Sequence, residues 1–172
     1  MRIVAGRWRG RSITAPDGRQ VRPTADRVRE AWMSIVAPLL PDARVLDLCA
    51  GSGALGIEAV SRGAACADLV EIAPQSLRAI RSNLELLGAG DAIRVHRQDA
   101  LRFIAGLEPG AYDVAFADPP YDLAMAPAIA ERWLAVPFAT VLGIEHRRTE
   151  HLPGDGDRRQ YGQTAITFYG RD

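Results

Sequence analysis

Four consecutive residues with chemically different side chains follow an apolar run at 112–117: Asp118, Pro119, Pro120 and Tyr121. The run is typical of a β-strand, so this tetrad leaves a strand end. Prolines fix φ and lack an N–H donor, so the turn has few conformations and holds its carbonyls outward. A plain Pro-rich turn explains an isolated tetrad more simply. Behind a glycine loop, however, the acceptor and the aromatic ring together suggest an enzyme that methylates the exocyclic amine of a base.

That glycine loop lies at 49–53, between an apolar run and a helical pattern. Gly51, Gly53 and Gly56 fit G-x-G-x-x-G, a spacing that brings backbone close to a ligand and presents the N–H groups of a helix N-terminus. Glu71 follows at the predicted end of the next strand, where it is suitably placed to accept both ribose hydroxyls. A dehydrogenase that uses NAD fits these features as well.

Asp47 argues against a dinucleotide, because a carboxylate inside the first strand repels phosphate but suits a cationic ligand. S-adenosylmethionine carries a sulfonium and an ammonium group and no phosphate. We therefore expect Asp47 to reach that ammonium, directly or through water, while loop N–H groups bind the carboxylate; a solvated strand-end carboxylate is the alternative. Asp99 accepts the adenine amine or caps the following helix, and both roles remain open. The expected cofactor-binding residues are Asp47, Cys49, Ala50, Gly51, Ser52, Gly53, Glu71, Ile72, Asp99, Ala100 and Asp118.

Positive charge gathers at the start of the chain, although the net charge is zero. Residues 1–30 hold eight arginines and three acidic residues, a balance of +5 that leaves −5 for the remainder. Such a segment binds phosphate backbones largely irrespective of sequence, and a merely solvated strand face is the alternative. Trp8 either stacks on a base or anchors a hairpin. The expected RNA-binding residues are Arg7, Trp8, Arg9, Arg11, Arg22, Thr24 and Arg27.

The segments that position these residues alternate between apolar strands and helices, a pattern that predicts a parallel sheet covered on both faces. We expect strands at 44–49, 67–72, 92–96, 112–117 and 139–145, and helices at 54–62, 74–87, 99–106 and 124–134. Residues 2–14 predict a small hairpin that turns near Gly6 to Gly10. Thr24 is expected to cap a helix that runs to about Leu40. Residues 158–163 and 164–169 predict a closing antiparallel hairpin.

Composition limits the remaining possibilities. A chain of 172 residues with 48% apolar and 24% charged residues is long enough for one domain with a core. No apolar run approaches the roughly 18 residues of a membrane span, and no signal peptide is apparent, so we expect a cytoplasmic protein. Cys49 and Cys66 are expected to be buried free thiols. The three histidines form no cluster with ligand spacing, so no metal is expected.

Four segments together resemble one family of class I S-adenosylmethionine-dependent methyltransferases, the RsmD-type enzymes that methylate guanine N2 of small-subunit ribosomal RNA. They are 2–11, the sequence R-P-T-A-D-R-V-R-E at 22–30, the glycine loop with its flanks at 47–59, and the tetrad at 118–121. The second is the most specific to this family. The resemblance implies a Rossmann-like α/β fold with a seven-stranded, mostly parallel, doubly wound sheet and an antiparallel C-terminal hairpin. It also implies one domain, with an N-terminal hairpin and helix extension at 1–40 and a cofactor-binding catalytic core at 41–172.

The function implied by this resemblance is methylation of 16S rRNA by a monomer, within a partly or fully assembled small subunit. Tyr121 would stack on an unpaired or flipped guanine, while Asp118 and the Pro119 carbonyl accept hydrogen bonds from its exocyclic amine. An adenine-N6 methyltransferase that acts on DNA or RNA is the main alternative, although no insertion is large enough for a DNA-recognition domain. A non-catalytic nucleotide-binding or RNA-binding module is the other.

Overall fold

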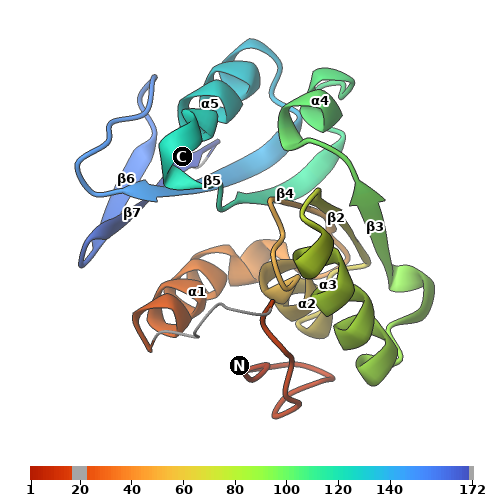
Figure 1. Ribbon diagram of the computed structural model, residues 1–172. Helices are drawn as coiled ribbons and strands as arrows, with labels where there is room; N and C mark the ends of the chain where they lie inside the picture. The colour runs from red at the N-terminus through yellow and green to blue at the C-terminus, as the bar shows by residue number, and fades with distance from the viewer. Residues whose placement is uncertain (17–22, 171–172) are drawn as a thin grey trace.

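The computed structural model describes residues 1–16 and 23–170 (Figure 1), and it has one mixed sheet of seven strands. The strands are β1 (Arg44–Leu48), β2 (Cys66–Glu71), β3 (Ile93–Arg97), β4 (Tyr112–Ala117), β5 (Ala139–Arg147), β6 (Asp157–Tyr161) and β7 (Thr164–Tyr169). Their order is β3-β2-β1-β4-β5-β7-β6. The first five are parallel, and β7 is antiparallel to both β5 and β6. The predicted sheet and closing hairpin are confirmed.

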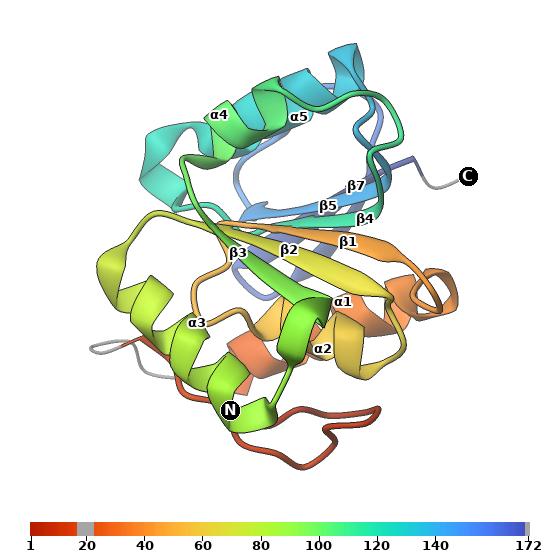
Figure 2. The same cartoon turned by 90° about the vertical axis from the view of Figure 1, so that its right-hand side faces the viewer.

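Helices cover both faces of the sheet, with α4 and α5 on one side and α1, α2 and α3 on the other (Figure 2). They are α1 (Pro23–Val36), α2 (Ala54–Ser61), α3 (Pro74–Leu87), α4 (Ala100–Ala105) and α5 (Met125–Ala135), with 3₁₀ turns at Ala37–Leu39, Gly90–Ala92 and Tyr121–Leu123. Local signals set these ends: α3, for example, begins at a proline and ends at Gly88, whose φ of 60° is left-handed. No helix among the described residues is long and apolar enough to cross a membrane.

The strand order reverses between β1 and β4. Strands β2 and β3 lie on one side of β1, and the remaining strands lie on the other. In open α/β sheets, ligands bind outside the carboxyl ends of the strands at such a reversal. The glycine loop follows β1 and the tetrad follows β4, so the topology brings these two segments together at that point.

Helix α1 packs against the sheet through Trp32, which is almost fully buried. The indole makes edge-on contacts with Phe116 of β4 and Phe168 of β7, at centroid distances of 5.5 and 6.4 Å. Gly143 of β5 makes room for the indole, because a Cβ there would lie 2.6 Å from the Trp32 Nε1. The prediction of one helix to Leu40 is wrong: the α-helix ends at Val36 and a 3₁₀ turn follows. Thr24 lies inside the first helical turn, after Pro23, and so does not precede the helix as a cap.

The N-terminal hairpin exists but is minimal, with a single antiparallel bridge between Arg2 and Ser12. It lies along the outer side of α2 and α3 (Figure 2) and turns between Gly6 and Gly10, as predicted. Gly6 has a φ of 86°, and a Cβ there would lie 1.7 Å from the carbonyl oxygen of Ser61 in the last turn of α2. Only glycine allows the hairpin to lie this close to the helix.

Candidate functional site

The glycine loop between β1 and α2 is a turn in which several backbone N–H groups already donate hydrogen bonds within the protein. Cys49, Gly51 and Gly53 have φ values of 58°, 60° and 82°, in the left-handed region. The Gly51 N–H donates to the Glu71 carboxylate at 2.8 Å, and the Gly53 N–H donates to the Ala50 carbonyl at 2.8 Å. These two N–H groups are therefore engaged before any ligand arrives, which differs from the expectation that the loop offers its donors to a ligand.

Asp47 is buried at the end of β1, with 1% of its surface exposed, so a solvated strand-end carboxylate is excluded. Its Oδ2 accepts a hydrogen bond of 2.9 Å from the Gly56 N–H in the first turns of α2. Burial raises the pKa of this carboxyl well above its usual value; the Gly56 N–H opposes that effect, and the charges of Asp118 and Glu71 add to it. Asp47 thus holds loop and helix together while lining a cavity.

Glu71, at the end of β2, ties its own strand end to the glycine loop. Besides the Gly51 bond made by Oε2, its Oε1 accepts hydrogen bonds from the Ile72 and Ala73 N–H groups at 2.8 and 3.0 Å. The carboxylate therefore holds a fixed orientation at the edge of a cavity that it lines together with Ile72.

Asp99 is the N-cap of α4, because its Oδ1 accepts a hydrogen bond of 3.0 Å from the Arg102 N–H. The same residue and Ala100 line the cavity next to Glu71. The capping role is confirmed, and the place of Asp99 beside the cavity is compatible with a second role toward a ligand.

The tetrad leaves β4 as expected, and all four of its residues line the larger cavity, although they differ in exposure. Pro119 is buried, whereas Asp118, Pro120 and Tyr121 are exposed, Tyr121 at 37%. The Tyr121 hydroxyl lies 3.1 Å from the Thr164 Oγ1 and 3.4 Å from the Glu145 Oε1, which fixes the ring against β5 and β7. On the other side, the Arg147 guanidinium carbon lies 5.3 Å from the ring centroid.

Glu145 is a site residue that the sequence reasoning missed. It follows Ile144, which pairs with Ala117 in the parallel ladder of β4 and β5, so the register places it beside Asp118. Burial raises the pKa of Glu145 to about 8, and the negative charge of Asp118 and a hydrogen bond with it act in the same direction. The available signal was the position of Glu145 at the end of the fifth predicted strand, since carboxyl ends of adjacent parallel strands meet.

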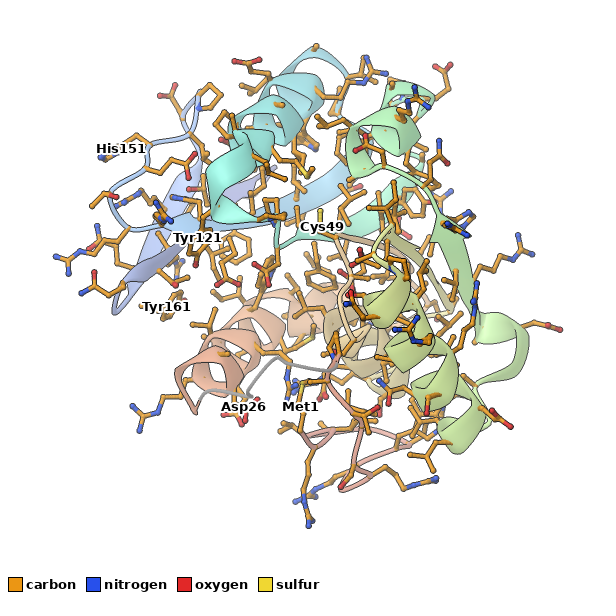
Figure 3. The ribbon with its side chains drawn as sticks, viewed as in Figure 1. Met1, Asp26, Cys49, Tyr121, His151 and Tyr161 are labelled. Atoms are coloured by element: carbon orange, nitrogen blue, oxygen red, sulfur yellow. The ribbon has the colours of Figure 1, made fainter. Side chains whose placement is uncertain are left out.

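Two cavities of about 240 and 450 Å³ meet at this edge of the sheet, and Cys49 and Asp118 line both. Figure 3 shows Cys49 and Tyr121 at the strand ends, with Met1 and Asp26 across from them on the N-terminal segment. The larger cavity runs toward β2 and α4, past Glu71, Asp99 and the tetrad. The smaller cavity lies beside α1 and is lined by the glycine loop, Asp47 and Glu145. Every expected cofactor residue except Gly53 lines one of them: Asp47, Cys49, Ala50, Gly51, Ser52, Glu71, Ile72, Asp99, Ala100 and Asp118.

Both cysteines are free thiols, as predicted, but they are half-buried and not fully buried. Cys49 donates through its S–H to the Met125 Sδ at 3.4 Å. Burial, and then the negative charges of Glu71 and Asp47, raise the pKa of the Cys49 thiol to about 12. The thiol is therefore protonated at neutral pH. In the described part of the chain, no group of three or more His, Cys, Asp or Glu side chains has a geometry that could hold a metal ion.

The arginine-rich hairpin is not brought together with the cavities. Arg7, Arg9 and Arg11 are exposed, but the backbone at Arg7 and Trp8 is bound to Ser61 at the far end of α2, with N–H bonds of 2.9 and 3.1 Å. Arg11 also donates to the Leu86 carbonyl at 2.7 Å.

Trp8 does not stack on a base in this arrangement, which corrects its assignment to the RNA-binding set. Only 7% of it is exposed, and the Arg7 guanidinium covers its ring at 4.1 Å. It anchors the hairpin on α2, the alternative left open above. Arg27 is exposed on α1, whereas Arg22 and the side chain of Thr24 lie outside the described residues.

Comparison with known proteins supplies the family. The family model described as "Conserved hypothetical protein 95" matches residues 1–170. The chain is 45% identical over 122 residues to "Ribosomal RNA small subunit methyltransferase D" of Escherichia coli, a match that covers 70% of this chain and 60% of that protein. It is 33% identical to the "Putative rRNA methyltransferase YlbH" of Bacillus subtilis over 98% of both chains.

Solved structures agree with the sequence matches. The "Putative methyltransferase yhhF" of Escherichia coli superimposes with a TM-score of 0.83 at 32% identity, covering 98% of this chain and 96% of that one. A hypothetical protein of Thermus thermophilus gives a TM-score of 0.82 at 32% identity over 98% of both chains. With the reversal of the sheet, the loop after β1 and the tetrad after β4, the chain belongs to the family described as conserved hypothetical protein 95, the RsmD-type methyltransferases.

Proposed function

We propose that this protein transfers a methyl group from S-adenosylmethionine to the exocyclic N2 amine of a guanine in 16S rRNA. The observation that carries the proposal is the placement of Asp118 where the two cavities meet, with Tyr121 lining the larger one, in a member of this family. The matched E. coli and B. subtilis relatives bear rRNA methyltransferase names, and the E. coli match spans 60% of that protein's length. In this proposal the extension at 1–40 and the core at 41–172 form one domain. The protein acts as a monomer in the cytoplasm.

The chemistry of the cavity lining supports the choice of cofactor. The larger cavity offers Glu71 to ribose hydroxyls, Asp99 to an adenine amine and the apolar side chain of Ile72 to the adenine face. The smaller cavity offers Asp47 toward an ammonium group. Bound there, S-adenosylmethionine would supply an electrophilic methyl group. A dinucleotide fits less well, because its phosphates would lie against the carboxylates of Asp47 and Asp118.

The acceptor side follows from the tetrad. An aryl amine delocalises its lone pair and is a poor nucleophile. Asp118 and the Pro119 carbonyl accept its two N–H groups, which favours a pyramidal nitrogen whose lone pair points at the methyl group. Tyr121, held by Thr164 and Glu145, stacks on the base. Alignment of amine and methyl group would supply most of the rate gain. The N–C bond would form as the S–CH3 bond breaks, so that S-adenosylhomocysteine leaves and the nitrogen releases one proton to solvent.

The test is a comparison of methyl acceptors. Purified protein is incubated with labelled S-adenosylmethionine and, in parallel, naked 16S rRNA, assembled small subunits lacking the modification, and duplex DNA. Digestion to nucleosides then identifies the methylated base. We expect N2-methylguanosine from one or both RNA substrates and no label in DNA. N6-methyladenine in any of the three products would establish the alternative, and absence of label in all three would support a binding module.

A further inference from the structure

We propose that Arg29 of α1 binds the carboxylate of the amino-acid part of the cofactor, which makes the N-terminal helix a wall of the cofactor site. This inference rests on the proposed function and gives the R-P-T-A-D-R-V-R-E segment a task other than contact with RNA. Arg29 would also be a hydrogen-bond donor to the cofactor carboxylate, for which the glycine loop has too few free N–H groups.

Arg29 is buried although it carries a permanent charge. It lies on the same face of α1 as Trp32 and Met33, three and four residues later, and is 8% exposed. Its Nη2 donates to the Arg2 carbonyl at 2.9 Å, and the Asp26 carboxylate lies 3.6 Å away. Its Nε is buried without a partner among the described residues. A buried charge that is paired so incompletely is costly, unless an anion joins it.

The cavity next to Arg29 has the charge pattern of a zwitterion site. Four acidic residues line it, and Arg29 is the one basic side chain among the described residues of its lining. The acidic ones are Asp26, Asp47, Asp118 and Glu145. A phosphate would meet four acidic side chains and one guanidinium. An α-amino acid group, with one ammonium and one carboxylate close together, satisfies both kinds of lining residue.

The loop itself explains why an arginine is needed. A carboxylate at this position is commonly expected to bind N–H groups of the glycine turn, but those of Gly51 and Gly53 already donate to Glu71 and Ala50. A guanidinium presents several donors in one plane and pairs with a carboxylate through two parallel bonds. Arg29 and the loop line the same cavity from opposite elements, α1 and the β1 end.

The experiment compares two ligands that differ only in the carboxylate. Binding of S-adenosylhomocysteine and of decarboxylated S-adenosylhomocysteine is measured by calorimetry, without any methyl transfer. The native protein should prefer the carboxylated ligand by roughly ten- to a hundredfold, the strength of a hydrogen-bonded charge pair. Arg29→Gln should bring this ratio close to one and leave the affinity for the decarboxylated ligand within about twofold. Arg27→Gln, an exposed arginine on the same helix, is the matched control and should keep the native ratio.

Because Arg29 is buried, Arg29→Met is measured beside Arg29→Gln, since methionine keeps much of the apolar stem. The ratio is internal to each variant, so a general loss of stability does not imitate the result. A native ratio near one, or a ratio that survives in either variant, would overturn the role of Arg29 while leaving the proposed function intact. Failure of the native protein to bind either ligand would instead overturn the cofactor assignment on which the inference rests.

Discussion

The two ends of the N-terminal extension use arginine in opposite ways. At its base, Met1, Ala15 and Pro16 line the smaller cavity together with the buried Arg29 of α1. At its tip, Arg7 and Arg9 are exposed, and the backbone N–H groups of Arg7 and Trp8 donate to Ser61. The eight residues of α2 separate Ser61 from the glycine loop, which is about 12 Å of helix.

This contrast shows that a cluster of like charges in a sequence need not act as one surface. The charge count of the first thirty residues suggests a single cationic arm. Packing divides it: the helix turns one arginine toward the acidic cavity, and the hairpin carries others away from it. We therefore propose that the base binds the cofactor and the tip binds a polyanion, and the following variants test that division.

The largest effect is expected at the cavity. Asp118→Ala should lower the rate of methyl transfer at saturating substrate by roughly 10² to 10⁴-fold, because the amine loses the acceptor that orients it. S-adenosylhomocysteine binding, measured by calorimetry, should stay near native. Arg9→Gln at the tip should leave the rate at saturating RNA unchanged. Near-native transfer by Asp118→Ala with normal cofactor binding would remove Asp118 from the reaction.

A second variant disrupts only the contact between the tip of the hairpin and α2. Gly6→Ala places a Cβ against the Ser61 carbonyl and should lower the free energy of unfolding by roughly 2 kcal/mol or more, through the clash and the left-handed φ together. Gly10→Ala is the matched control, because Gly10 has a similar φ of 82° but an added Cβ meets nothing within 4 Å. Urea unfolding measures both, and equal losses in the two variants would show that the contact with Ser61 adds nothing.

The neighbouring carboxyl groups of Glu145 and Asp118 in the cavity predict that the stability of the protein depends on pH. Glu145 has a pKa of about 8 in the folded protein and about 4.3 when unfolded. Between these values the folded state binds more protons, so stability falls as pH rises, and the full penalty is present above pH 8. Glu145→Gln removes the penalty, and its stability relative to native should rise by roughly 4 kcal/mol between pH 5 and pH 8.5.

Denaturant unfolding at several pH values measures this difference. Glu85→Gln, an exposed residue of α3, is the control and should follow the native curve. A constant offset between Glu145→Gln and native across the pH range would show that Glu145 ionises normally beside Asp118.

The smallest effect is expected at the exposed tip. Arg7→Gln with Arg9→Gln should weaken binding to 16S rRNA and reduce the slope of log affinity against log salt by about 1 to 2, since each phosphate contact contributes about 0.7 to 0.9. Filter binding at several salt concentrations measures the slope. Arg94→Gln, exposed on the edge strand β3, is the control. A slope that stays native would take the tip out of RNA binding.

The regular part of the fold is predictable because local signals and hydrophobic pattern agree there. The predicted helix at 74–87 coincides with α3, whose ends carry a proline and a left-handed glycine. The predicted end of α1 is wrong, because Pro38 lacks the N–H that would continue the α-helix and lies instead at the start of the 3₁₀ turn that follows Val36. The hairpin is recognisable from its glycines, but the contact of Gly6 with Ser61 depends on tertiary packing.

The candidate site is predictable where its residues follow directly from strand ends. Asp47, Glu71, Asp99 and Asp118 are found because each ends or follows a strand in a parallel sheet. Glu145 and Arg29 are missed for a different reason. In the sequence Glu145 is simply part of a predicted strand, and its position beside Asp118 follows only from the register of β5. Arg29 is one member of a cluster of arginines, and only the orientation of α1 shows that it is buried.

The burial of the Cys49 thiol among acidic side chains has a practical consequence for work with this protein. A thiol with a pKa near 12 has almost no thiolate at neutral pH, and thiolate is the form that alkylating reagents and peroxide attack. Cys49 therefore behaves as a small apolar spacer at the junction of the two cavities. Fluorophores attached through maleimide at neutral pH should leave this junction unlabelled, so that engineered surface cysteines can report on ligand and RNA binding while the native residue stays in place.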